Sequence, residues 1–205
     1  MDISLAKKTT PSTKRHIRTK QAILDAALAL VIEKGPDQLS LREVARRVDY
    51  SPAGLYEYFR DKEAIIAALC QVGFKRLADD LNTVPVDLPL KEYLHKLGSA
   101  YLSYAAKNPE YYRLIFNFIP SERQSLQEPV EDGDPYFILM QAMARGLASG
   151  EIKTTEEDHA ESLSYGFWAF LHGISMLRAT ILKDFEADFE TANRRAIEIF
   201  LKGLF

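Results

Sequence analysis

The spacing of helix start and stop signals constrains the fold of this chain more than any other sequence feature. Gly35-Pro36 predicts a helix end, Ser51-Pro52 predicts a helix start, and Gly150 predicts another end. Between such signals apolar residues recur every three or four positions, and no segment alternates as a half-buried strand would. The sequence therefore predicts an all-α fold. The nine expected helices cover approximately residues 15–34, 41–48, 52–58, 62–81, 90–107, 109–119, 135–149, 156–182 and 188–203.

Polar residues at the expected helix starts match known capping patterns. Ser40 and Glu43 have the spacing of a capping box, and Asp61 stands one residue before the helix expected at 62–81. Thr155 and Asp158 have the same box spacing before the helix expected at 156–182. The segment 120–134, rich in Pro, Ser, Gly and acidic residues, is expected to be a loop.

The charge of the chain is unevenly distributed. The 205 residues carry a net charge of −3, but residues 1–62 hold 12 Lys and Arg against 8 Asp and Glu. Residues 63–205 hold 14 basic against 21 acidic side chains, which makes them net acidic. A basic N-terminal third in an acidic chain indicates a nucleic-acid partner at that end.

Membrane and secreted classes are disfavoured. No stretch approaches the roughly 20 apolar residues of a membrane span, and the N-terminal MDISLAKKTT has no apolar run of signal-peptide length. The single cysteine, Cys70, excludes an intramolecular disulfide, and its apolar neighbours indicate a buried small side chain rather than a redox sensor. We therefore expect a cytoplasmic protein without membrane contact.

An enzyme is also disfavoured. The four histidines, His16, His95, His159 and His172, fall in separate expected helices without metal-ligand spacing. The sequence contains no GxGxxG, Walker or GxSxG motif. We expect no catalytic residue, no metal and no cofactor.

Residues 39–60, LSLREVARRVDYSPAGLYEYFR, have the pattern of a helix-turn-helix. Two short helices are joined by about three residues, and each has an apolar face. These faces consist of Leu41, Val44, Ala45 and Val48 in the first helix, and Leu55 and Phe59 in the second. Because any two short helices with a tight turn share this pattern, the pattern alone leaves DNA binding and a purely structural role open.

A longer stretch, Ile23 to Leu69, resembles the DNA-binding domain of the tetracycline-repressor (TetR) family. It has ILDAA and EKG on the first helix, SLREVA on the second, LYEYF on the third and DKEAI at the start of the fourth. Two positions depart from the family pattern. Asp49 replaces the usual turn Gly but tolerates a left-handed backbone, and Tyr58 replaces a frequent His.

The resemblance implies a helix-turn-helix domain at residues 1–62 and a ligand-binding and dimerisation domain at 63–205, with the helix 62–81 as connector. It also implies DNA contacts. Ser40, Ser51, Tyr56, Tyr58 and Lys62 would contact phosphates, Arg42 would reach a base or a phosphate, and Pro52, Ala53 and Gly54 would present a small apolar surface to thymine methyls. The basic arm, residues 1–14 and onward to Lys20, is expected either to follow the DNA or to be a disordered tail.

Aromatic residues are concentrated in the second domain, where 13 of the 22 lie between Tyr93 and Phe170. The resemblance implies a pocket for a small apolar or aromatic effector. Its expected lining is Tyr101, Tyr104, Phe116, Phe137, Met140, Trp168 and His172. The alternative is a filled aromatic core in a constitutive or architectural DNA-binding protein with no effector.

The segment YGFWAFLHGISML, 165–177, resembles the Trp-His-Gly signature of one TetR subclass through Trp168, His172 and Gly173. This helix is apolar on two faces, so one face is expected to meet its own domain and the other a partner subunit. The sequence does not assign the faces. Together these features predict a homodimeric repressor of a palindromic operator.

Overall fold

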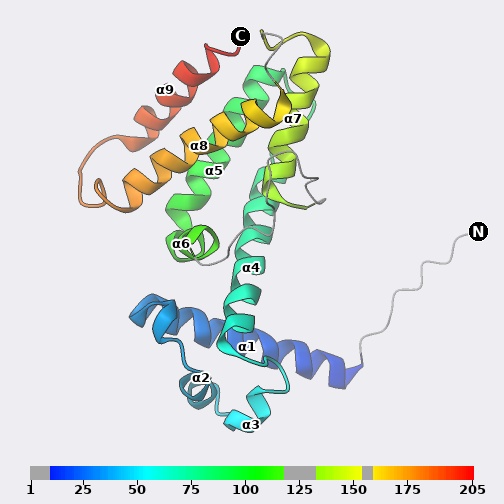
Figure 1. Cartoon of the computed structure of the whole chain (residues 1–205), viewed down its shortest axis with the longest axis vertical. Helices are drawn as coiled ribbons and strands as arrows, with labels where there is room; N and C mark the ends of the chain where they lie inside the picture. The colour runs from blue at the N-terminus through cyan, green and yellow to red at the C-terminus, as the bar shows by residue number, and fades with distance from the viewer. Residues whose placement is uncertain (1–9, 118–132, 154–158) are drawn as a thin grey trace, which may run out of the picture. The chain divides into compact units, whose positions relative to one another are not determined.

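The computed structural model describes residues 10–117, 133–153 and 159–205, which form nine α-helices, one short 3₁₀ helix and no strand (Figure 1). The all-α prediction is therefore confirmed for this part of the chain. Two compact units are present, Met1–Leu69 and Cys70–Phe205. The boundary lies within one helix, and the functional division expected after residue 62 stays a prediction. No helix in the described ranges is both long and apolar enough to cross a bilayer.

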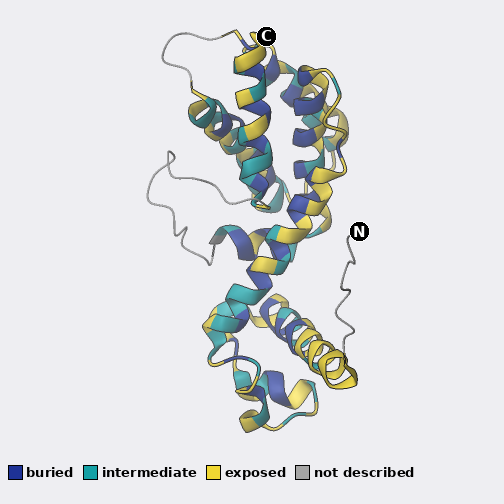
Figure 2. Cartoon of the chain, turned by 90° about the vertical axis from the view of Figure 1, so that its right-hand side faces the viewer, coloured by how far each residue is buried: buried dark blue, intermediate teal, exposed yellow. Residues whose placement is uncertain are grey.

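The first unit consists of α1 (Pro11–Lys34), the 3₁₀ helix η1 (Pro36–Gln38), α2 (Leu41–Arg47), α3 (Pro52–Leu55) and the start of α4 (Lys62–Asn82). The core is formed by one face of each helix, while the N-terminal half of α1 is exposed (Figure 2). The largest fully buried side chains of this unit are Ile23, Leu30, Leu55, Ile65 and Leu69.

The helix α1 begins four residues earlier than predicted. Thr10 caps it by accepting a hydrogen bond from the Thr13 N–H at 3.2 Å, and Pro11 occupies the first helical position, where no N–H is needed. Residues 11–14 of the basic arm are thus helical, and residues 1–9 lie outside the described residues. Gly35 ends the helix with φ 83° and ψ 158°. Its φ is positive, but its ψ lies outside the left-handed helical region.

Two local predictions in the first unit are wrong. The Ser40 side chain makes no capping hydrogen bond at α2: the Glu43 N–H donates to the Ser40 carbonyl at 3.0 Å, and the Glu43 carboxylate binds Lys34 at 2.6 Å. The helix α3 ends at Leu55 instead of about residue 58. The N–H groups of Glu57 and Tyr58 donate to carbonyls three residues earlier in the chain. These residues therefore form a turn and do not continue the α-helix.

The second unit contains the remainder of α4 with α5 (Leu90–Lys107), α6 (Pro109–Asn117), α7 (Pro135–Ser149), α8 (Ala160–Ala179) and α9 (Phe189–Leu201). The helix α5 is central, since it contacts α6, α7, α8 and α9. Gly98 allows the close approach of α8 and α9. A Cβ there would lie 3.1 Å from Phe167 Cζ and 3.2 Å from Ile197 Cδ1. Cys70 is fully buried, as predicted.

The helix ends of the second unit follow the sequence signals in three cases. Asp134 caps α7, Gly150 ends it in a left-handed conformation, and Asp188 caps α9 by accepting from the Thr191 N–H at 3.0 Å. The start of α8 differs from the prediction because His159, paired with Ser162, caps a helix that begins at Ala160. The predicted box of Thr155 and Asp158 lies outside the described residues, as does Phe118 of the helix predicted to reach residue 119.

Candidate functional site

The helices α2 and α3 form a tight helix-turn-helix. Asp49 adopts a left-handed conformation with φ 58°, as its position in the turn predicts. The Tyr50 N–H donates to the Ala45 carbonyl at 2.9 Å, and Ser51 caps α3 through the Gly54 N–H at 3.0 Å. Val44, Ala45 and Leu55 are fully buried beneath the turn. These contacts hold α3 rigidly with respect to α2.

The outer face of α3 is small and accessible. Ser51, Pro52 and Ala53 are exposed, and Tyr56 after the helix is 59% exposed. Gly54 is half-buried, and a Cβ there would lie 3.0 Å from Tyr50 Cδ1, so its backbone packs on Tyr50. Pro52, Ala53 and Gly54 offer backbone, methyl and methylene surface without a side-chain donor, as expected for contact with thymine methyls.

Ser40 and Arg42 lie exposed at the start of α2. Within the described residues, the Arg42 guanidinium makes no hydrogen bond or ion pair. The neighbouring charges are less available. Arg47 binds both carboxylate oxygens of Glu33, which lowers the pKa of that carboxyl. Arg42 is therefore an exposed basic side chain near the N-terminus of α2 that is not bound to a neighbouring group. From this position it can reach a base edge.

Two predicted phosphate ligands are held by neighbours. The Tyr58 ring stacks on the His16 ring, with the centroids 4.6 Å apart and the planes at 19°, and the Lys62 ammonium donates to the Asp37 carbonyl at 3.4 Å. Sequence reasoning did not assign His16 a role. His16 already lay within the predicted helix 15–34, but its stack on Tyr58 joins residues distant in sequence and had no local signal.

In the second unit, four of the seven predicted pocket residues come together in one aromatic cluster. Phe116 of α6 lies at its centre, with its ring centroid 4.8 Å from that of His172, 6.1 Å from that of Trp168 and 6.4 Å from that of Tyr101. Tyr112, which was not among the predicted lining residues, also belongs to the cluster, 4.8 Å from Phe116. We call these five residues the aromatic cluster.

The polar atoms of the aromatic cluster bond to one another. The Tyr101 hydroxyl lies 3.2 Å from the Tyr112 hydroxyl, which lies 2.6 Å from Nδ1 of His172. Burial raises the pKa of both tyrosines and lowers the pKa of His172, so all three are neutral near pH 7. Each hydroxyl can donate or accept in this chain, and the tautomer of His172 sets the direction of its bond to Tyr112.

The other three predicted pocket residues lie apart. Tyr104 is fully buried and donates its hydroxyl to the Gly73 carbonyl of α4 at 2.8 Å. Phe137 and Met140 lie half-buried on α7. Phe116, Trp168 and His172 are also only half-buried. The predicted set is thus divided between buried tyrosines and a partly open aromatic surface.

Two hollows in the described part of the second unit have volumes of about 470 Å³ and about 880 Å³, and none of the seven residues lines either of them. In the same described ranges, no three His, Cys, Asp or Glu side chains converge as metal ligands would.

Comparison with known proteins agrees with this architecture. Residues 23–69 match the family described as bacterial regulatory proteins, tetR family, and residues 94–200 match the family described as tetracyclin repressor-like, C-terminal domain. The fold and the helix-turn-helix define a DNA-binding transcription regulator rather than an enzyme. The chain belongs to the TetR family. Its resemblance to the Trp-His-Gly subclass stays a prediction.

Individual relatives cover nearly the whole chain. The uncharacterized HTH-type transcriptional regulator YobS of Bacillus subtilis is 25% identical over 91% of this chain and 92% of its own. A protein of unknown function from Rhodococcus sp. RHA1 has a similar structure, with a TM-score of 0.74 and 24% sequence identity. The match covers 98% of this chain and 99% of that protein. The TetR-family regulator PfmR of Thermus thermophilus has a TM-score of 0.62 at 20% identity, covering 89% and 98%.

Proposed function

We propose that this regulator is a cytoplasmic, homodimeric repressor that binds a palindromic operator and leaves it when a small apolar or aromatic effector binds. The observation that carries the DNA-binding part is the face formed by Pro52, Ala53 and Arg42. A small apolar surface at the start of α3 and an uncommitted guanidinium at the start of α2 are both exposed on this helix-turn-helix. Thymine methyls and one guanine edge are the base features that such a face can distinguish.

The positioning contacts surround this face. Ser40, Ser51, Tyr56, Tyr58 and Lys62 are proposed to bind phosphates, which orient the helix without specifying sequence. The stack of Tyr58 on His16 supports this role for Tyr58, because it leaves fewer orientations to the phenol before DNA arrives. Lys14, Arg15 and Arg18 on the exposed start of α1 would add charge toward the DNA backbone.

The dimer interface is proposed to lie on one face of α8. Tyr165 and Leu177 are 48% and 47% exposed, and Ala169 and Gly173, also exposed, lie between them at four-residue intervals. A Cβ at Gly173 would meet nothing within 4 Å, which is consistent with room for another helix. The neighbouring α9 adds Ile199, 58% exposed. An apolar stripe of this kind on a transcription regulator favours a second copy as the occupant.

The other two faces of α8 have occupants within the chain. Phe167, Leu171 and Ser175 are buried, and Trp168 and His172 belong to the aromatic cluster. A dimer through the exposed stripe would set two recognition helices about one DNA turn apart, roughly 34 Å, on a palindrome.

The effector is proposed to act at the aromatic cluster, through Phe116. This ring contacts Trp168 and His172 of α8 and lies edge-on to Phe74 of α4, with the centroids 6.1 Å apart. A ligand that displaces Phe116 would therefore also move α4, which contributes residues to both units. Coupling of about 1–3 kcal/mol is typical of such linkage.

A constitutive DNA-binding protein with a filled core is the second candidate. The mutual ring contacts and the hydroxyl chain of the aromatic cluster favour it, because packed groups leave little space. The half-burial of Phe116, Trp168 and His172 favours the effector site, since a filled core would cover them.

The experiment that tests the regulator begins with selection of duplexes from a random pool by the full-length protein. We expect an enriched palindrome bound by one dimer, with a half-site duplex bound at least tenfold more weakly. Enrichment of no sequence, or equal affinity for palindrome and half-site, would contradict the proposal. Compounds that release the protein from this duplex then separate the effector-responsive repressor from the constitutive protein.

A further inference from the structure

The larger hollow of the described second unit, about 880 Å³, lies among the ends of several helices. It is bounded by α5 from His95 to Lys107, by α6, by the C-terminal part of α8 and by the N-terminal half of α9. Its volume falls within the range of roughly 300–1,000 Å³ that is usual for small-molecule sites. We call it the basic groove because of the five cationic side chains at its rim: Lys107, Arg113, Arg178, Lys183 and Arg194.

The charge of the basic groove is opposite to that of the surrounding chain. Glu190 is the single acidic residue of its lining, although residues 63–205 carry an excess of acidic residues. Among the described residues, Lys107, Arg113 and Arg194 have no carboxylate within ion-pair distance, and Lys183 has only Asp184, at 3.8 Å. A cleft lined by one sign of charge concentrates ions of the other sign.

Two guanidinium groups are fixed in place without being neutralised. Arg113 donates to the Ala179 carbonyl at 3.2 Å, and Arg178 lies 3.9 Å from the centroid of the Phe189 ring. Carbonyls and rings orient a guanidinium but leave its charge and several of its five N–H donors available. Arg113 and Arg178 lie at the C-terminal end of α8, whose carbonyls favour nearby cations. Arg194 comes from α9, so this helix end does not explain its presence in the groove.

The inner surface of the basic groove is apolar. Leu102, Ala105 and Ile197 are buried, and Ile174 beside them is half-buried. A small inorganic anion would meet the rim and leave Ile174 and the exposed edges of Leu102 and Ala105 in contact with water. The shape therefore suits a molecule that has both an anionic head and a hydrocarbon body.

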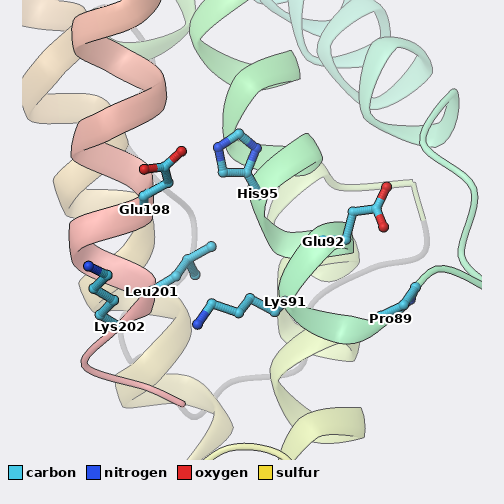
Figure 3. Close-up of a pocket in the computed structure, with 7 residues that line it drawn as sticks. All are labelled: Pro89, Lys91, Glu92, His95, Glu198, Leu201 and Lys202. Carbon is cyan, nitrogen blue, oxygen red and sulfur yellow. The ribbon is translucent and has the colours of Figure 1, made fainter.

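The smaller hollow of about 470 Å³, between the start of α5 and the end of α9, has a different character (Figure 3). His95 and Glu198 face one another at one end, and Lys91 points toward Lys202 at the other. With Glu92 its acidic and basic residues are balanced. The net positive charge is thus specific to the basic groove and not a general property of the α5–α9 surface.

We propose that the basic groove binds an amphipathic organic anion, with a carboxylate or phosphate head on Arg113 and Arg194 and an apolar body against Leu102 and Ile174. The site is separate from the aromatic cluster, none of whose residues lines it. It thus goes beyond the effector site proposed above and does not depend on that site.

Calorimetric titration of the full-length protein tests this site with four ten-carbon probes below their micelle concentrations. Decanoate and decyl phosphate carry the anionic head, decanol lacks charge, and decyltrimethylammonium reverses it. We expect saturable binding of at least one anionic probe, with at least about tenfold weaker binding of decanol and of the cation, because charge-assisted hydrogen bonds are lost. The stronger of the two anions identifies the head group.

Variants locate the site. Arg113 and Arg194 are exposed, so Arg113→Gln and Arg194→Gln should fold normally. Each should weaken binding of the anionic probe by about tenfold. Lys153→Gln removes an exposed cation outside the basic groove and should leave binding unchanged. Ala106→Trp should block the groove whatever the head group. Equal binding of decanol and decanoate, insensitivity to both arginine variants and to Ala106→Trp, or an equal loss in Lys153→Gln would each overturn the proposal.

Trp168 emission separates this result from the effector hypothesis. Because Trp168 does not line the basic groove, an anionic probe bound there should leave its emission unchanged. A probe that shifts Trp168 emission and still binds to Ala106→Trp occupies the aromatic cluster instead, and the basic-groove assignment is then wrong.

Discussion

The hydroxyl of Tyr112 on α6 lies 2.6 Å from Nδ1 of His172 on α8, inside the aromatic cluster. Tyr101 completes the chain of polar atoms from α5. These bonds join three helices at the place where the family resemblance puts the effector. The packing of these helices also buries His172, and this burial lowers the pKa of its imidazole.

This relationship predicts a pH dependence of stability. Because burial lowers the pKa of folded His172 below its ordinary value of 6.5, the unfolded chain binds its proton first as the pH falls. The contribution of neutral His172 to the free energy of unfolding is therefore full above about pH 6.5 and decreases as the pH falls below it. The groups that face His172, Tyr101 and Tyr112, stay neutral throughout. Urea unfolding at pH 7.5, 6.5 and 5.5 measures the slope.

The same titration in His172→Gln should show a smaller slope over this range. The paired carboxyls Glu33 and Glu43 have pKa values lowered from 4.5, so they titrate below this window. An identical slope in His172→Gln and the unmodified protein would show that His172 is not the group responsible.

DNA binding should respond differently to phosphate and base contacts. Tyr56→Phe and Lys62→Ala should weaken binding to the selected operator and to its single-base variants by the same factor, about three- to tenfold, because phosphate contacts carry no sequence information. Arg42→Ala should lose about 1–3 kcal/mol at one position of each half-site and relax the preference there. Lys153→Ala is the matched control. Unchanged affinity in all three variants would exclude the proposed interface.

The dimer face can be tested with one charge. Leu177→Glu should convert the dimer to a monomer at micromolar concentration, since it places a carboxylate at the C-terminal end of the exposed apolar stripe of α8. Val86→Glu introduces the same charge at a side chain that is 67% exposed in the α4–α5 connection, and it should remain dimeric. Light scattering distinguishes the two. A dimeric Leu177→Glu would move the interface elsewhere.

Two phenylalanines distinguish a pocket wall from a core. Phe167 is fully buried, and Phe167→Ala should lower the free energy of unfolding by about 3–5 kcal/mol. Phe116 is half-buried, so Phe116→Ala should have a smaller effect and mainly change the response of Trp168, the single tryptophan, to an effector. Equal losses of stability, with an unchanged response, would favour the filled core.

Glycine positions test the helix packing of the second unit. A Cβ at Gly146 would lie 2.5 Å from Ile152 Cδ1, so Gly146→Ala should destabilise the fold by about 1–3 kcal/mol. Gly166 on α8 has no neighbour within 4 Å, and Gly166→Ala should stabilise by up to about 1 kcal/mol through helix propensity. Thermal unfolding of the two variants gives opposite shifts if the packing is as described.

The starts and ends of several helices depend only on residues close by in the sequence, so they could be predicted from it. Ser51 and Pro52 start α3, Asp188 starts α9 and Gly150 ends α7, because a cap requires only atoms within a few residues. The burial of Val44, Ala45 and Leu55 follows from helical periodicity in the same way. The order of these signals was sufficient to identify the TetR resemblance and the exposed face of α3.

Other features needed contacts between distant residues. The Glu43 carboxylate of the predicted Ser40 box instead binds Lys34, which comes from another helix. Tyr101 and Tyr104 share one face of α5, yet one hydroxyl bonds to Tyr112 and the other to the Gly73 carbonyl, since residues three apart still point in directions about 60° apart. Periodicity shows that α8 is apolar on more than one face, but only its neighbours decide which face is buried, which meets the aromatic cluster and which remains exposed.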